Sequence, residues 1–222
     1  SLFFFSLFLQ QVQGWSASDT GWRLMPQFIA TGIVASQFGR LTRRYQVHTL
    51  MIAGYGLVGA SMLLLTLFSA DTPYALLAFL FLFLGAGSGL AVPATSAAAM
   101  ASVPAQRSGM ASATTNALRQ AGMLIGIALL GTLMSARAIA LLAEALAHAG
   151  VPDARQAAVA AVSRHELGAL ASLDPGMAHG LLAGALTGGF HAAMLCAGLA
   201  GLLAAGLLVS VRPRAAALPA RA

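Results

Sequence analysis

A single arginine inside an otherwise uncharged run is the residue whose position most strongly suggests chemistry. Arg119 lies about ten residues into the apolar run 108–136, or about 15 Å along a helix. Asn116, Gln120 and Met123 share its helix face, because the four positions follow i, i+3, i+4 and i+7 spacing. A guanidinium in apolar surroundings requires a wet cavity, a ligand or a carboxylate. The stripe therefore predicts a cavity wall that contacts a substrate or pairs with a carboxylate. The alternative is an arginine that snorkels or braces neighbouring helices.

Three alternating glycines and a proline interrupt a second apolar run, 72–106. Gly85, Gly87 and Gly89 weaken a helix near its middle, and Pro93 removes a backbone donor and clashes with the preceding turn. Kinked or broken helices at membrane depth line cavities in transporters. The segment therefore predicts a helix kink with a gating role, and the alternative is a packing kink with no such role.

Other motifs in the sequence favour packing over catalysis. The G-x-G-x-x-G match at 54–59 lies inside an apolar helix, whereas a dinucleotide site needs a preceding strand, so close helix packing is the better interpretation. Ser88 and His191 invite comparison with intramembrane serine proteases, but Ala86 stands where their G-x-S-G turn needs glycine. The single cysteine, Cys196, supports neither a disulfide nor a cysteine-based zinc site. We expect no catalytic residue, metal or cofactor.

The elements that carry these residues are long apolar helices. The chain is 59% hydrophobic and 8% charged, whereas a soluble domain usually carries about 25% charged residues. The net charge of +6 comes from arginines scattered between apolar runs, which excludes a continuous patch for nucleic acid. We predict an all-α integral membrane fold with membrane spans at about 1–12 (truncated), 20–39, 47–69, 75–100, 109–135 and 188–211. The remaining 137–187 is expected to form an outer loop of short amphipathic helices, and 212–222 a cytoplasmic tail.

The distribution of charge orients these spans. Alternation through the bilayer puts seven arginines and no acid on one side: Arg40, Arg43, Arg44, Arg107, Arg212, Arg214 and Arg221. The opposite side receives four arginines and all six acids: Asp19, Asp71, Glu144, Asp153, Glu166 and Asp174. The positive-inside rule makes the arginine-rich side cytoplasmic and 137–187 periplasmic.

Several segments in the first 136 residues resemble conserved blocks of one transporter family. They are Leu9–Pro26, Gly87–Pro93, Val103–Ser112 (with Ser108 inserted between the expected arginine and glycine), Asn116–Gly122 and Gly126–Thr132. In order, they are similar to the motifs of the fourteen-span, EmrB/QacA-type drug:proton antiporters of the major facilitator superfamily.

The resemblance implies a function and a set of partners. The chain would be the C-terminal six-helix half, with its first helix truncated, of a proton-coupled exporter of drugs or other hydrophobic or cationic compounds. Its partners would be the lipid bilayer of the inner membrane, protons, a small-molecule substrate and the missing N-terminal half; a periplasmic adaptor is left open, and no nucleic acid is expected. Alternatives are a metabolite or siderophore exporter of the same superfamily, an intramembrane enzyme, or a structural membrane subunit.

One cytoplasmic loop departs from the family pattern. Where the family often has G-x-x-x-D-R-x-G, this chain has Gly39, Arg40, Arg43 and Arg44, so that Arg43 replaces the acid. The replacement argues against a charge relay through this loop. The proton-carrying carboxylates that the family implies are expected in the N-terminal half, because no predicted span contains an acid in its interior.

Overall fold

A computed structural model describes residues 5–6, 14–67, 72–163, 168 and 173–211. These residues form helices connected by short turns, which confirms the predicted all-α fold. The helices are α2 (Ala17–Leu41), α3 (Val47–Leu64), α4 (Tyr74–Ala101), α5 (Ser108–His148), α6 (Ala154–Ser163) and α7 (Pro175–Ser210), with 3₁₀ turns at Leu65–Leu67 and Ala105–Arg107.

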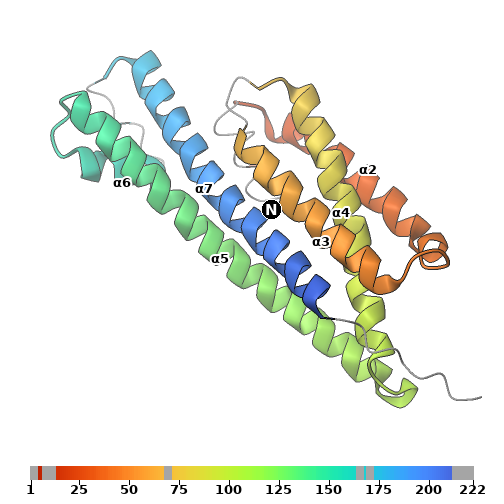
Figure 1. The fold of residues 1–222 in the computed structure, drawn as a ribbon. Helices are drawn as coiled ribbons and strands as arrows, with labels where there is room; N and C mark the ends of the chain where they lie inside the picture. Colours follow the sequence, from red (N-terminus) through yellow and green to blue (C-terminus); the bar gives the residue numbers. More distant parts are fainter. Residues whose placement is uncertain (1–4, 7–13, 68–71, 164–167, 169–172, 212–222) are drawn as a thin grey trace, which may run out of the picture.

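The long helices run antiparallel to one another along the chain (Figure 1). The turn 42–46, the connection 102–107 and the end of α7 lie at one end of the bundle, and α6 lies at the other. Within the described residues, four helical segments are long and apolar enough to cross a membrane: Val47–Leu67, Tyr74–Ala101, Ala105–His148 and Pro175–Ser210. Helix α2 is less apolar than these, because Asp19, Arg23 and Arg40 lie near its ends.

Helix α5 extends beyond the predicted span 109–135. It continues to His148, because the added segment is rich in alanine and leucine, which favour the helix. It ends just before Gly150, whose φ of +75° lies in the left-handed region that glycine adopts without strain.

Helix α7 begins well before the predicted residue 188. Pro175 occupies its first turn, and the Asp174 carboxylate accepts hydrogen bonds from the backbone N–H groups of Gly176 at 3.0 Å and Met177 at 3.4 Å. The ends of 137–187 are therefore continuations of the two long helices. In the described part of that segment, α6 is the one separate short helix, where several had been expected.

Helix α6 packs at the end of the bundle opposite the turn 42–46 (Figure 1). Ala158 and Ala161 of α6 are buried against Leu142 and Leu146 of α5 and against Ala185 of α7. This cluster is separate from the main core. It holds the C-terminal end of α5 against the N-terminal end of α7.

The predicted truncated span 1–12 lies outside the described residues except for Phe5 and Ser6. Phe5 is 1% exposed, and its ring makes edge-to-face contacts with Phe81 of α4 at 5.1 Å and with Phe190 of α7 at 5.8 Å. Phe5 therefore lies in the main core between α4 and α7.

The middle of α4 is held by close backbone packing on two sides. A Cβ atom added to Gly89 would lie 2.8 Å from the carbonyl oxygen of Thr31 on α2, and Gly85 packs equally closely against Ala30. A Cβ atom on Gly87 would lie 2.9 Å from the carbonyl oxygen of Gly54 on α3. Glycine is required at these positions because any side chain would collide with backbone.

Helix α4 is continuous through the predicted kink. The helix includes Pro93 and runs without interruption to Ala101. The structure therefore gives the three glycines a packing role, and gating by this segment stays a prediction.

An aromatic clasp joins the N-terminal part of α2 to the start of α4. The Arg23 guanidinium carbon lies 3.5 Å from the ring centroid of Trp15 and 4.5 Å from that of Tyr74. The Tyr74 hydroxyl donates a 3.0 Å hydrogen bond to the backbone carbonyl of Arg23. The arginine is thus stacked between two rings and tied to the first residue of α4.

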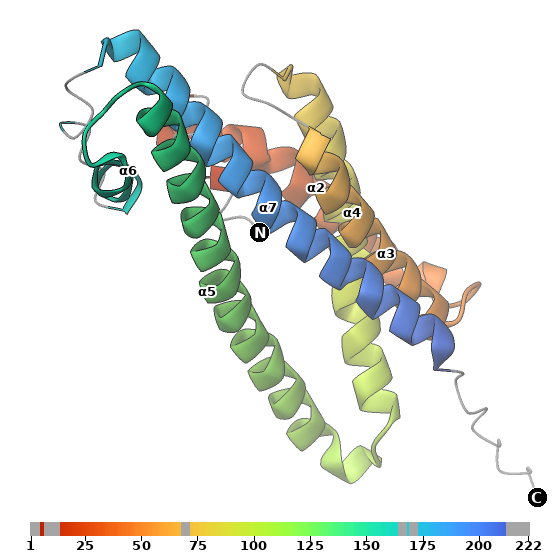
Figure 2. The same ribbon diagram turned by 60° about the vertical axis from the view of Figure 1, so that its left-hand side comes forward.

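The first part of α5 stands apart from this packed block (Figure 2). In its most apolar window 11% of residues are buried, against 44% in α4. Gly122 and Gly126 have nothing within 4 Å of an added Cβ atom. Apolar composition alone therefore does not decide which helices are covered in this chain.

Candidate substrate pocket

Arg119 projects from the separated part of α5. One of its guanidinium nitrogens, Nη2, donates a 2.7 Å hydrogen bond to Oδ1 of Asn116, one turn earlier. Both side chains are exposed in the described chain. Arg119 lies eleven residues after the start of α5 at Ser108, or about 16 Å along the axis. In a span of about 30 Å that began at Ser108, this position would be close to the middle.

Asn116 and Arg119 line a cavity of about 270 Å³ between α4 and α5. The two helices diverge from their connection at 102–107 (Figure 2), and the cavity lies in the angle between them. Helix α4 contributes Val92, Ser96 and Met100, and α5 contributes Ser112, Thr115, Asn116 and Arg119.

The spacing along each helix explains why these residues face one another. Val92, Ser96 and Met100 follow each other at intervals of four and so form one stripe on α4. On α5 the lining begins at Ser112, so that the polar stripe extends one turn earlier than the sequence predicted. The α4 wall was missed, although its spacing in the sequence could have identified it.

Two residues of the predicted stripe lie outside this lining. Gln120 and Met123 are both exposed on α5, and Met123 has 53% of its surface accessible. The cavity therefore brings together Asn116 and Arg119 from the predicted set, and substrate contact by Gln120 and Met123 stays a prediction.

The cavity has one formal charge, which is positive. Between residues 72 and 143 the sequence contains no aspartate or glutamate. Glu144 is on the same helix but 25 residues beyond Arg119, or about 37 Å along its axis. Among the described residues Asn116 is the one hydrogen-bond partner of Arg119. Most of the five N–H donors of the guanidinium thus make no hydrogen bond to another described residue.

Two hydroxyl groups that line the cavity already donate hydrogen bonds within their own helices. Ser96 Oγ donates to the Val92 carbonyl at 3.1 Å, and Thr115 Oγ1 donates to the Ala111 carbonyl at 2.8 Å. Their protons are used within their own helices, so both oxygens act toward a ligand as acceptors. Donors come from Arg119, from the amide nitrogen of Asn116 and from the Ser112 hydroxyl.

The predicted cytoplasmic loop residues lie on one exposed turn. Arg40, Arg43 and Arg44 line an open depression at the end of α2. Arg40 Nη1 donates a 3.1 Å hydrogen bond to Gln37 Oε1, and Gly39 has open space around an added Cβ atom. The turn presents three guanidinium groups without a carboxylate among the residues that line the depression.

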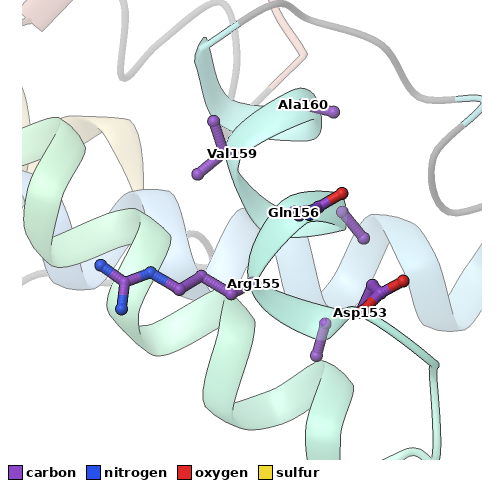
Figure 3. A pocket seen from close by; sticks show the side chains of 7 residues that line it. Asp153, Arg155, Gln156, Val159 and Ala160 are labelled. Carbon is purple, nitrogen blue, oxygen red and sulfur yellow. The ribbon is translucent and has the colours of Figure 1, made fainter.

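A further cavity, of about 840 Å³, lies at the start of α6 (Figure 3). All its lining residues belong to 153–160, and the side chains of Asp153 and Arg155 point away from each other. The described residues of its lining come from this one short helix and the residue before it, so they form an open depression that does not surround a ligand.

The residues that suggested catalysis are engaged in other contacts. The Ser88 hydroxyl donates to the carbonyl of Leu84 in its own helix at 2.9 Å. Over the described part of the chain, no three His, Cys, Asp or Glu side chains are grouped so that they could hold a metal ion.

The comparison with known families identifies the class of protein. The profile of the Major Facilitator Superfamily matches residues 1–151, which is more than half of the 222-residue chain. The chain belongs to the Major Facilitator Superfamily and is a multi-pass membrane protein of a transporter family, not an enzyme. The superfamily that the sequence motifs predicted is thereby confirmed.

Several curated relatives are resistance or efflux proteins. "Multidrug resistance protein Stp" of Mycobacterium tuberculosis is 35% identical over 146 residues, which are 66% of this chain and 27% of that protein. "Methylenomycin A resistance protein" of Bacillus subtilis is 33% identical over 60% of this chain and 29% of the relative. "Multidrug efflux pump LfrA" of Mycolicibacterium smegmatis is 31% identical over 61% of this chain and 27% of the relative. The chain thus spans less than a third of the length of the relatives it matches.

Proposed function

We propose that this chain is the C-terminal part of a proton-coupled transporter of the fourteen-span branch, which exports drugs or other hydrophobic compounds across the inner membrane. The observation that carries the proposal is a polar cavity between two apolar membrane helices of a Major Facilitator Superfamily chain. Ligand sites of membrane transporters lie near the bilayer midplane, between helices that rearrange during alternating access.

The geometry of α4 and α5 supports the proposal. Helix α4 is held rigidly on its α2 and α3 sides, whereas its cavity side and the first part of α5 are exposed. When one wall of a cavity is held and the other wall can move, the cavity can change which side of the membrane it opens to. The names of the relatives, which refer to multidrug resistance and efflux, supply the class of cargo.

Proton coupling is assigned to another part of the transporter. The interiors of the helices α2, α3, α4, α5 and α7 contain no acid that could carry a proton through the membrane. We therefore place the proton-carrying carboxylates in segments that pack against this chain.

The test is export by the full-length protein in an efflux-deficient bacterial host. Expression is expected to raise the inhibitory concentrations of several hydrophobic antibiotics and to drive dye efflux that stops when a protonophore collapses the proton gradient. Expression of a version with the 102–107 connection deleted, verified in the membrane, serves as the inactive control. Efflux that is absent, or that persists without a proton gradient, would remove the proton-coupled assignment.

A further inference from the structure

We infer that the cavity between α4 and α5 recognises the acidic group of an amphiphilic substrate, with Arg119 as the charged donor and Asn116 as the residue that orients it. The inference rests on the proposed function, because it names the substrate class of the same cavity. It also departs from the family resemblance, which implies hydrophobic or cationic cargo.

The charge balance of the cavity is the first argument. Arg119 is the one ionisable residue in its lining, and no carboxylate of the chain lies in the interior of the surrounding helices. A cationic compound would meet a charge of the same sign in a region of low dielectric, where repulsion is weakly screened. A carboxylate, phenolate or sulfonate would instead supply the counter-charge that a guanidinium at this depth requires.

The arrangement of donors is the second argument. The 2.7 Å hydrogen bond to Asn116 Oδ1 engages Nη2 of Arg119 and fixes the guanidinium in the cavity wall. The same contact turns the Asn116 amide so that its NH₂ group is left for a ligand. Ser112 adds a hydroxyl to the lining one turn before Asn116. An oxyanion between these groups would accept hydrogen bonds from two or three donors, as in other charge-assisted sites.

The apolar part of the lining is the third argument. Val92 and Met100 flank Ser96 on the opposite wall, and each is at least 40% exposed toward the opening. Valine provides a rigid apolar surface, and methionine provides an adaptable one that tolerates different shapes. A polar wall opposite a largely apolar wall matches a small amphiphile that carries an acidic group.

The test compares two dyes that share a xanthene ring but differ in charge: fluorescein, an anion at neutral pH, and pyronin Y, a cation. Binding of each dye to the detergent-purified full-length transporter is measured by fluorescence anisotropy. The wild type is expected to bind fluorescein, and Arg119→Gln to weaken that binding by about tenfold or more, since a charge-assisted hydrogen bond is lost. Binding of pyronin Y is expected to be unchanged or stronger, because the variant removes a charge of the same sign as the dye.

A second variant retains the arginine and a similar side-chain volume. Asn116→Asp places a carboxylate next to Arg119, neutralises the cavity, and is expected to weaken fluorescein binding while pyronin Y binding is unchanged or stronger. Arg137→Gln removes an exposed arginine from the same helix and outside the lining, and is the matched control expected to change neither dye. The thermal midpoint of each variant shows that the protein is folded.

Three outcomes overturn the inference: a wild type that does not bind fluorescein, Arg119 variants that lose both dyes together, or variants that lose neither. Loss of both dyes would identify Arg119 as a brace between helices. Because the binding assay does not require transport, none of these outcomes tests the exporter proposal. The protonophore experiment tests that proposal separately. Fluorescein binding without any protonophore-sensitive efflux would instead count against the exporter proposal alone.

Discussion

The middle of α4 and the first part of α5 show two uses of the same residue types. Both segments are apolar helices with glycines at small intervals, at Gly85, Gly87 and Gly89 in α4 and at Gly122 and Gly126 in α5. The α4 glycines are covered by backbone of α2 and α3, whereas the α5 glycines have open space around them. A glycine pattern therefore indicates that a helix is able to pack closely, and its neighbours decide whether it does.

The polar residues of the two segments differ in the same way. In the packed block, Tyr55 of α3 and Thr95 of α4 share a 3.1 Å hydrogen bond between their hydroxyls, and Thr31 bonds to the carbonyl of Gly85 at 3.1 Å. On α5, Asn116 and Arg119 bond to each other and face a cavity. Polar groups stabilise helix contacts in the first region, and they remain available to a ligand in the second.

The largest expected effect on stability comes from filling a packed glycine. A Cβ atom at position 54 would lie 2.6 Å from the backbone nitrogen of Ala91, so that Gly54→Ala forces α3 and α4 apart. We expect the free energy of unfolding of the full-length protein to fall by about 2 kcal/mol, as for other overpacked interiors. Denaturant unfolding in detergent micelles measures it. A variant as stable as the wild type would mean that α3 and α4 do not pack this closely.

A smaller loss of unfolding free energy is expected when the aromatic clasp at the edge of the packed block is removed. Arg23→Ala removes the cation from between Trp15 and Tyr74. The expected cost is about 1 kcal/mol, because this arginine is only partly buried. Arg23→Lys is the matched control and should retain part of the stability, since lysine keeps the charge without the planar stacking. Equal losses for both variants would show that the stacking geometry matters more than the charge.

The interhelical hydrogen bond between Tyr55 and Thr95 is expected to contribute still less to the free energy of unfolding. Tyr55→Phe removes it and keeps the ring, at an expected cost of about 0.6 kcal/mol, the average for such bonds in membranes. Thr115→Val on α5 removes a hydroxyl that bonds within its own helix at 2.8 Å, and serves as the comparison. The same unfolding measurement applies, and a larger loss for Thr115→Val would reverse the assigned roles of the two regions.

The smallest effect, with the opposite sign, is expected at an open glycine. Gly126→Ala adds a methyl group where nothing lies within 4 Å. Alanine favours the helix over glycine, so we expect a gain of about 0.5 kcal/mol in unfolding free energy. A clear loss in the full-length transporter would locate a further segment against this face of α5.

The sequence predicted the helical class, because that class depends on local patterns, whereas the role of the polar stripe on α5 stays a prediction. Long uncharged runs require lipid, and Arg119 is the one charged residue of the run 108–136. The helix ends were less well predicted. Residues 137–148 and 175–187 were assigned to an outer loop, yet alanine and leucine propagate α5 and the Asp174 cap starts α7 early. The α4 wall of the cavity was missed, because its residues carry no charge and gain meaning only opposite Asn116 and Arg119.

By itself the sequence determined that the chain forms membrane helices, which ends of them carry the arginines, and that one charge lies near mid-span. These follow from the cost of placing charge and unpaired backbone in hydrocarbon, which acts on each segment separately. Only the tertiary structure decided that Gly87 and Gly89 serve packing, that Gly122 and Gly126 are open, and that Ser96 faces Arg119. Those outcomes depend on which helix lies alongside which, and contacts between residues distant in the chain set that arrangement.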